Sequence, residues 1–253
     1  MTEQPTAPGY GLDAPKVVIG NAVGGAAGLA VALLLWLLLR RRHRPAAALV
    51  SGWCGLWGAV GVAQAGLMLR SSRSGKLAER DQLLDALALR GDEELLDVGC
   101  GRGLLLIGAA KRLPTGRAFG VDLWRNQDQA GNSRQATMAN AAAEGVAERV
   151  ELRDGDARDL PFDDASFDVV VSSLALHNLA GADARRQAVR EIVRVLKPDG
   201  RVALLDFTGT GQYAQALTEA GLAEVRRSGR RFGMWPPVRV VTAVKATRLY
   251  AAS

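Results

Sequence analysis

The chain has 253 residues, a length that accommodates one α/β domain together with a small additional segment. Its net charge of +6 is divided evenly, +3 on residues 1–69 and +3 on the remainder, which excludes the concentrated basic surface of a nucleic-acid-binding protein. Two cysteines and two histidines without metal-ligand spacing predict neither a disulfide framework nor a metal site.

Two long uncharged stretches follow a predicted N-terminal tail, residues 1–16. Val17–Leu39 has 23 residues without a charge, and a helix needs about 20 apolar residues to cross a bilayer core. It is too long for a signal peptide and lacks a clean cleavage site. Ala46–Leu69 is also uncharged and long enough, although it is less hydrophobic and richer in glycine. The short linker Arg40–Pro45 therefore favours a transmembrane helical hairpin over residues 17–69.

Small residues predict how these helices associate. Gly20, Gly24 and Gly28 recur every four residues and share one helix face, which allows close approach of a second helix. That helix is either residues 46–69 of the same chain or the same face of a second copy, which would give a homo-oligomer.

The basic residues give conflicting indications of topology. The linker Arg40–Arg44 and the cluster Arg70, Arg73, Lys76 and Arg80 both favour the cytoplasmic side. Two complete crossings put these clusters on opposite sides, so the depth of the second segment stays open.

From residue 76 to the end, short apolar runs alternate with amphipathic stretches. This alternation is typical of βα units and predicts a parallel sheet in an α/β domain, residues 76–253. Two final strands without a helix between them predict an antiparallel hairpin at the edge of a seven-stranded, mostly parallel sheet. The predicted strands are Glu94–Asp97, Ala118–Asp122, Val150–Arg153, Phe167–Ser172, Arg201–Asp206, Val225–Ser228 and Val238–Lys245; the predicted helices are Asp81–Leu89, Leu104–Leu113, Asn132–Glu144, Ala182–Leu196 and Gln212–Ala220.

The first of these units contains a glycine-rich turn, LLDVGCGRGLLL over residues 95–106. Glycines at alternating positions between a strand and a helix let a ligand lie against bare backbone. The dinucleotide fingerprint G-x-G-x-x-G/A wants Gly or Ala where Leu104 stands, but Asp122 ends the next strand, where a ribose-binding acid is expected. The turn alone therefore suits a nicotinamide cofactor or another adenosine-containing ligand.

The order of motifs narrows this choice. LLDVGCGRG, GVDLW, RDGDARDLPFDDASFDVVVSSLALHN and LKPDGRVALLDF follow one another in the chain. Over about residues 78–247 this order resembles the class I S-adenosylmethionine-dependent methyltransferases, which have a Rossmann-like fold. The resemblance implies S-adenosyl-L-methionine as cofactor and methyl transfer as the activity.

The resemblance also implies a cofactor site. The turn from Asp97 to Gly103 would contact the methionine portion, with Gly99 and Gly101 closest to it. The remaining implied contacts are Asp122 with the ribose, Leu123 and Asp156 with the adenine, the Ala157 backbone N–H with the adenine, and Ser172 near the reacting methyl group.

His177 follows the fourth predicted strand, at the mouth of this site. It is the best candidate for a general base, although it could equally only line the pocket. The membrane segment favours a small or lipid-like methyl acceptor, at the cell membrane with the catalytic domain in the cytoplasm. The alternatives are a membrane-anchored nicotinamide-dependent oxidoreductase, which Leu104 disfavours, and a non-catalytic membrane adaptor.

A basic stretch lies near the C-terminus. Arg226, Arg227, Arg230 and Arg231 precede the sequence FGMW, residues 232–235. This stretch is either a contact for anionic lipid head groups or an ordinary exposed hairpin loop.

Overall fold

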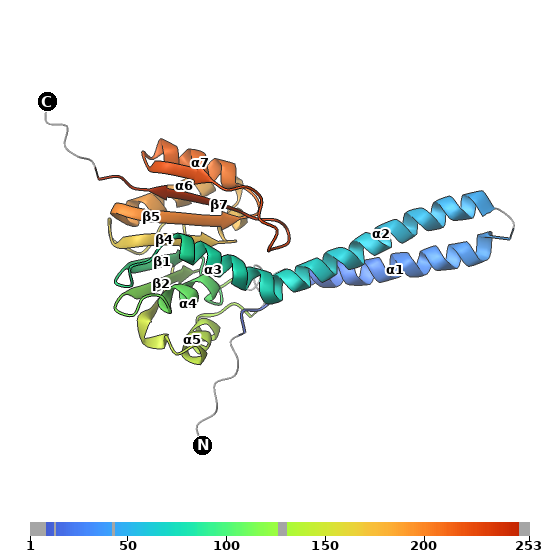
Figure 1. The fold of residues 1–253 in the computed structure, drawn as a ribbon, viewed down its shortest axis with the longest axis horizontal. Coiled ribbons are helices and arrows are strands. Elements are labelled where there is room, and N and C mark those ends of the chain that lie inside the picture. The colour runs from blue at the N-terminus through green and yellow to red at the C-terminus, as the bar shows by residue number, and fades with distance from the viewer. Residues whose placement is uncertain (1–8, 13, 42–43, 126–130, 248–253) are drawn as a thin grey trace, which may run out of the picture. The chain divides into compact units, whose positions relative to one another are not determined.

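The computed structural model describes residues 9–12, 14–41, 44–125 and 131–247. The chain divides into two compact units, Leu12–Gly75 and the combination of Met1–Gly11 with Lys76–Ser253 (Figure 1). The longer segment of the second unit starts at Lys76, and Gly9–Gly11 pack with that segment.

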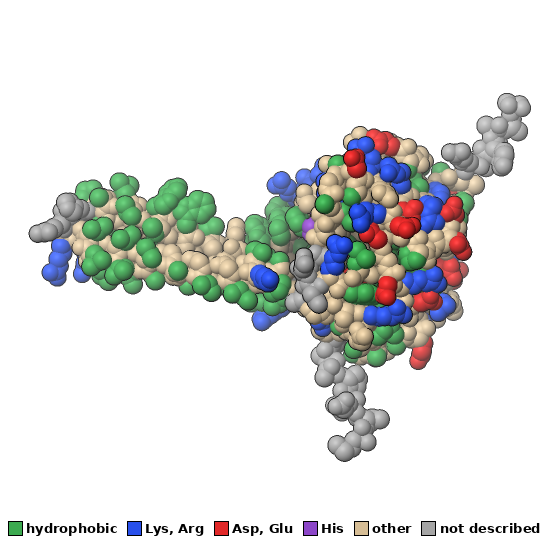
Figure 2. All heavy atoms as spheres, turned by 180° about the vertical axis from the view of Figure 1, so that it is seen from behind, with side chains coloured by type: hydrophobic (Ala, Val, Ile, Leu, Met, Phe, Trp, Pro, Cys, Tyr) green, Lys and Arg blue, Asp and Glu red, His purple; other side chains and the backbone are tan. Residues whose placement is uncertain are grey.

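The helical unit consists of α1 (Pro15–Leu39), α2 (Arg44–Arg70) and a π-helical turn, η1 (Ser71–Gly75). Two helical stretches are apolar enough to cross a membrane by length and composition. The most apolar 18 residues have a mean hydropathy of 2.3 in Pro15–Leu39 and of 1.5 in Arg44–Ala86, the continuous stretch that begins with α2. Large apolar side chains cover their outer faces, as the green surface in Figure 2 shows. Leu49 is 76% exposed and Leu38 is 66% exposed, so these helices are not the buried core of a larger domain.

Glycines allow α1 and α2 to pack closely, but Gly20 and Gly24 are not among the glycines at the contact. A Cβ on Gly25 would lie 2.6 Å from the Val62 nitrogen, and one on Gly58 would lie 2.7 Å from the Leu29 nitrogen. A Cβ on Gly20 or Gly24 would meet nothing within 4 Å.

Against α2, the predicted face therefore makes contact at Gly28, whose Cβ would lie 3.1 Å from the Gly58 Cα, and not at Gly20 or Gly24. Contact of the same face with a second copy stays a prediction. The contact residues Gly25, Gly28 and Ala32 are spaced three and four apart, as in a coiled-coil seam. A strict four-residue repeat drifts away from such a seam.

The second unit contains a seven-stranded sheet in the order β3-β2-β1-β4-β5-β7-β6. The first five strands of this order are parallel, and β7 runs antiparallel to both of its neighbours. The predicted fold class is confirmed. The strands are β1 (Glu94–Val98), β2 (Arg117–Asp122), β3 (Val150–Asp154), β4 (Phe167–Ser173), β5 (Leu196–Asp206), β6 (Ala223–Arg227) and β7 (Arg239–Val244); the helices are α3 (Lys76–Ala86), α4 (Leu104–Ala110), α5 (Arg134–Ala143), α6 (Gly181–Val195) and α7 (Thr210–Glu219), with short 3-10 turns η2 (Ala147–Arg149) and η3 (Leu176–Asn178).

Helices cover both faces of the sheet, which explains the uninterrupted apolar run in β4. Val169 and Val171 belong to the apolar cluster under α3 and α4, whereas Val170 faces the cluster under α6 and α7. Successive side chains of a strand point to opposite faces, so a strand buried on both sides needs apolar residues at every position.

One strand is longer than predicted. The sequence predicts a turn at residues 197–200, but β5 begins at Leu196 and passes through them. The backbone adapts at Asp199, which has a positive φ of 60° and donates its N–H to the Lys245 carbonyl. The end of β7 thereby keeps this segment within the sheet.

The carboxyl ends of the parallel strands form one edge, where Asp97, Asp122 and Asp206 end or nearly end β1, β2 and β5. Arg239 pairs with Asp206 in the antiparallel register, so the loop that precedes β7 starts from the same edge. In α/β folds of this kind, ligands bind at this edge.

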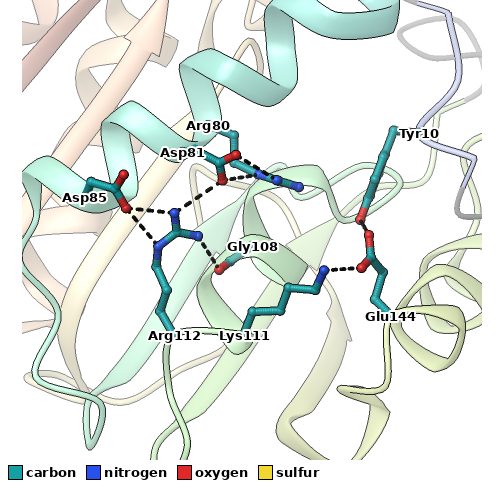
Figure 3. A network of polar contacts seen from close by, with 8 residues as sticks. All are labelled: Tyr10, Arg80, Asp81, Asp85, Gly108, Lys111, Arg112 and Glu144. Carbon is teal, nitrogen blue, oxygen red and sulfur yellow. Dashed lines mark hydrogen bonds and ion pairs between the residues drawn. The ribbon is translucent and has the colours of Figure 1, made fainter.

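Ion pairs hold α3 and the N-terminal residues to the rest of the unit (Figure 3). Arg112, just after α4, contacts Asp81 and Asp85 of α3 at 3.2 and 2.7 Å. Tyr10 donates to Glu144, which also pairs with Lys111. The two chain segments that flank the helical unit are thus both bonded to the α4–α5 side of the domain.

Candidate functional site

The glycine-rich turn after β1 needs glycine for conformational and steric reasons. Gly99, Gly101 and Gly103 have φ values of 74°, 52° and 83°, a region that other residues rarely adopt. A Cβ on Gly99 would lie 2.2 Å from the Ala175 Cβ. The Gly99 amide donates to the Val121 carbonyl at 2.8 Å, which ties the turn to β2.

Asp97 is buried, and one of its two carboxyl oxygens lacks a hydrogen-bond partner in the described part of the chain. Its Oδ2 accepts from the Leu106 amide at 2.9 Å, whereas no donor in the described part of the chain bonds to its buried Oδ1. Burial, with the nearby Asp122 carboxylate, raises the pKa of Asp97 to about 8. A buried acceptor without a partner suits a cationic ligand group such as an ammonium.

Asp122 lies beside this turn, and its carboxylate accepts three hydrogen bonds within the domain. Its Oδ2 accepts from the Gly101 amide at 2.8 Å, and its Oδ1 accepts from the Trp124 amide at 2.6 Å and the Asn132 side chain at 3.2 Å. A carboxylate offers about four acceptor positions. These bonds therefore leave room for about one ligand hydroxyl, rather than the pair of a vicinal diol. The adjacent Leu123 is 43% exposed.

The remaining predicted cofactor residues have different surroundings. Asp156 forms an ion pair with Arg158, Oδ2 to Nη2 at 2.6 Å, which lowers the pKa of Asp156. Ala157 is half-buried against the apolar cluster under α6. Ser172 is buried, and its hydroxyl donates to the Val98 carbonyl at 2.7 Å. The Ser172 hydroxyl thus joins β4 to β1 at the edge of the site.

His177 lies in η3 at the same edge, next to Asp206. Its Nδ1 is 3.0 Å from Asp206 Oδ1, an ion-pair distance without good hydrogen-bond alignment. The imidazole is 20% exposed, whereas Asp206 is 1% exposed. The Phe207 ring lies 4.5 Å from the imidazole. A partly exposed imidazole beside a buried carboxylate is an arrangement that can accept a proton.

Asp206 is fixed by donors from several directions. It accepts from the Phe207 amide at 2.8 Å, the Tyr213 hydroxyl at 3.1 Å and the His177 amide at 3.2 Å. Burial and the Asp206 charge raise the pKa of Tyr213, so this hydroxyl keeps its proton and remains a donor. Neither residue was predicted as part of the site: Phe207 is the last residue of the motif LKPDGRVALLDF, and Tyr213 lies beyond it in α7.

A further contact to the glycine turn comes from the N-terminus. Arg102 donates from Nε to the Gly9 carbonyl at 2.5 Å, and the Gly9 amide donates to Asn140 at 2.9 Å. Asn140 in turn donates to the Arg102 carbonyl at 2.9 Å. These bonds brace the outside of the turn across more than 90 residues of sequence.

Comparisons with known proteins agree with this geometry. Residues 96–204 match the family model described as a methyltransferase domain. The chain is 35% identical over 145 residues to a demethylmenaquinone methyltransferase of Lactobacillus johnsonii, covering 56% of this chain and 54% of that protein. It is 36% identical over 138 residues to the chloroplastic 2-phytyl-1,4-beta-naphthoquinone methyltransferase of Arabidopsis thaliana, covering 54% and 50%. The chain spans about half the length of these relatives.

A solved structure shows the same fold. A SAM dependent methyltransferase from Aquifex aeolicus superposes with a TM-score of 0.57 at 18% identity, covering 72% of this chain and 98% of that chain. In this chain, the antiparallel strands β6 and β7 at one end of the sheet distinguish the fold from a nicotinamide-binding one.

Proposed function

We propose that this chain, whose residues 96–204 match a methyltransferase domain and which has the fold of the class I S-adenosylmethionine-dependent methyltransferases, transfers a methyl group to a small, apolar, quinone-like acceptor at a membrane. The observation that carries the transfer is the carboxyl edge of the sheet, which holds both the glycine turn with Asp97 and Asp122 and the His177–Asp206 pair.

The residues around the turn suit this cofactor. S-adenosylmethionine, when bound, supplies a methyl group on a cationic sulfur. The neutral thioether is a good leaving group when the methyl group is transferred. The unpartnered Oδ1 of Asp97 would accept from its ammonium group, and the turn through Gly99, Gly101 and Gly103 would lie against its methionine portion. Asp122 would accept from one ribose hydroxyl, while Leu123, Asp156, Ala157 and Ser172 stay proposed contacts.

His177 would remove a proton from a hydroxyl of the acceptor. Asp206 would orient the imidazole and stabilise its protonated form, as a buried carboxylate does for a catalytic histidine. Deprotonation makes a phenolic acceptor more nucleophilic, and positioning of the acceptor supplies much of the remaining rate enhancement.

The nature of the acceptor rests on two observations. Phe207 is 42% exposed beside His177, which makes this side of the edge suitable for an apolar ring. The relatives named above are quinone and naphthoquinone methyltransferases. An isoprenoid quinone precursor combines such a ring with a membrane-soluble tail.

Anchoring would come from α1 and α2. Lys76 donates to the carbonyls of Tyr10 and Gly11 at 2.9 and 2.6 Å, so the chain leaves for the helical unit and returns from it at neighbouring points of the domain. Two crossings would then leave the N-terminus and the domain on one side. We propose the cytoplasmic side, where the cofactor is expected.

The test uses the full chain in lipid nanodiscs. Calorimetry should detect binding of S-adenosylmethionine and not of NADH. A demethylated quinol, supplied in the reduced form that carries the phenolic hydroxyls, should take up labelled methyl from the cofactor. Binding of NADH alone would overturn the methyltransferase proposal, and binding of neither would favour a non-catalytic adaptor.

The role of His177 is tested by substitution. His177→Ala should lower turnover by about 10²-fold or more, the usual contribution of a general base, with little change in cofactor affinity. Asp206→Asn should lower turnover and shift its pH profile. Full activity of His177→Ala would leave this residue as a pocket lining only.

A further inference from the structure

The loop between β6 and β7 has a charge and an apolar tip that methyl transfer does not explain. Residues 225–239 contain five arginines and no Asp or Glu. The sequence allows two interpretations of this stretch, a lipid contact or an ordinary exposed loop. The structure provides observations that separate them.

The tip of the loop is held in a defined conformation. Arg231 and Val238 exchange backbone hydrogen bonds of 2.8 and 3.0 Å, which close the loop at its base. Met234 is 5% exposed and belongs to the apolar cluster under α3 and α4. Phe232, in contrast, is 64% exposed. An anchored loop thus presents one large apolar side chain outward.

Phe232 stands out within its unit. Among the described residues of Lys76–Ser253, it is the most exposed of the large apolar side chains, followed by Leu123 at 43% and Phe207 at 42%. All three lie in segments that leave the carboxyl edge of the sheet. Apolar exposure is therefore concentrated at the edge that carries the site, rather than scattered.

The loop is fastened to the part of the domain nearest in sequence to the apolar helix. Arg231 Nε lies 2.8 Å from Glu79 Oε2 in the first turn of α3, and Arg231 also donates to Gln82. A Cβ on Gly233 would lie 2.5 Å from Glu79 Oε1, so glycine lets the loop lie directly on α3. Glu79 follows Leu69, the end of the uncharged segment, by ten residues. Even fully extended, ten residues span at most about 35 Å.

Some of the five arginines form hydrogen bonds within the domain, and others are exposed to solvent. Arg227 donates to Thr210, and Arg239 donates to the Ser228 carbonyl. Arg230 is exposed next to the tip and has no ion pair within the described ranges. Arg226 is also exposed, with Glu224 at 3.5 Å.

We propose that the β6–β7 loop, residues 228–237, is a contact for an anionic bilayer surface. Phe232 enters the interfacial region, and Arg230 and Arg226 meet anionic head groups. Aromatic and basic residues combine in this way at membrane interfaces. The loop would then hold the carboxyl edge against the bilayer, so that an apolar acceptor reaches His177 without crossing water. The proposal rests on the membrane location proposed above, and not on the reaction.

Depth-dependent fluorescence quenching tests this contact in the full chain. In a Cys54→Ser background, Phe232→Cys carries an environment-sensitive fluorophore; Cys100 is buried and its burial raises its thiol pKa, so it does not react. The chain is reconstituted in nanodiscs of phosphatidylcholine with or without phosphatidylglycerol, with a spin-labelled lipid as quencher. The matched control is Glu148→Cys, which is exposed just before β3 at the opposite edge.

We expect quenching of the label at 232, stronger with phosphatidylglycerol, and little at 148. Arg230→Ser should weaken the quenching at 232, whereas Arg190→Ser, which removes an exposed arginine of α6, should not. Equal quenching at 232 and 148, or quenching that ignores lipid charge, would overturn the proposal. Failure of the chain to co-elute with the discs would instead overturn the membrane location, and cofactor binding measured on the same samples reports separately on the methyltransferase function.

Discussion

At the scale of single residues, Asp122 combines a structural contact with a proposed cofactor contact. Its carboxylate fixes the glycine turn through the Gly101 amide and, in the proposed function, accepts from the cofactor ribose. Asp122→Ala should therefore weaken S-adenosylmethionine binding by at least about tenfold, equivalent to about 1.4 kcal/mol. Calorimetry on the full chain measures this, with Asp159→Ala, an exposed acid in the loop after β3, as the matched control. Unchanged affinity would remove Asp122 from the cofactor site.

Asp97 predicts a dependence of stability on pH. Its pKa is raised to about 8 in the folded domain, from 3.8, because burial disfavours the charged carboxylate. The folded state thus retains a proton that the unfolded state releases, so this group makes the free energy of unfolding fall as pH rises from about 4 to about 8. In thermal unfolding experiments, Asp97→Asn should flatten this part of the profile. An identical profile for both proteins would show that Asp97 is ionised in the folded state.

At the scale of elements, the hairpin interface allows a matched pair of substitutions. Gly58→Leu places a side chain against the α1 backbone and should destabilise the packing of α1 on α2 by about 1–3 kcal/mol, the usual range for overpacking. Gly24→Leu meets open space and should leave thermal stability in detergent unchanged. If Gly24→Leu were the damaging change and also reduced the oligomer mass, the predicted homo-oligomeric face would be supported instead.

The elements also show what sequence reasoning can reach. Strand positions were predicted to within a few residues because apolar runs and turn residues are local signals, as β2 and β4 illustrate. The face of α1 that contacts α2 shares only Gly28 with the predicted glycine face, because it depends on how two helices cross, which a repeat within one helix does not determine. Site residues with a motif, such as Asp97 and Asp122, were found at strand ends. The sequence did not predict the contacts of Tyr213, Asn132 and Gly9, because the tertiary fold and not a local motif brings these residues to their partners.

At the scale of the whole molecule, Gly9 and Tyr10, which precede α1 in the sequence, are bonded to the glycine turn and to Glu144. Tyr10 is 8% exposed and donates to Glu144 at 3.0 Å, and the adjoining Gly9 braces the glycine turn through Arg102. Gly9–Gly11 thus pack with the α/β unit, and a substitution there should affect the glycine turn.

Tyr10→Ala should lower the stability of the domain by about 3 kcal/mol, the lower end for truncation of a buried aromatic residue, and weaken cofactor binding as Gly9 loses its support. Tyr10→Phe keeps the packed ring and loses the hydroxyl that donates to Glu144, so it should have a much smaller effect on both quantities. Chemical unfolding and calorimetry on the full chain measure the two. Tyr10 lies outside the cofactor motifs. A loss of cofactor affinity larger in Tyr10→Ala than in Tyr10→Phe would therefore show that the segment entering α1 supports the glycine turn. Equal affinity in both variants and the parent chain would show that Tyr10 contributes to stability only.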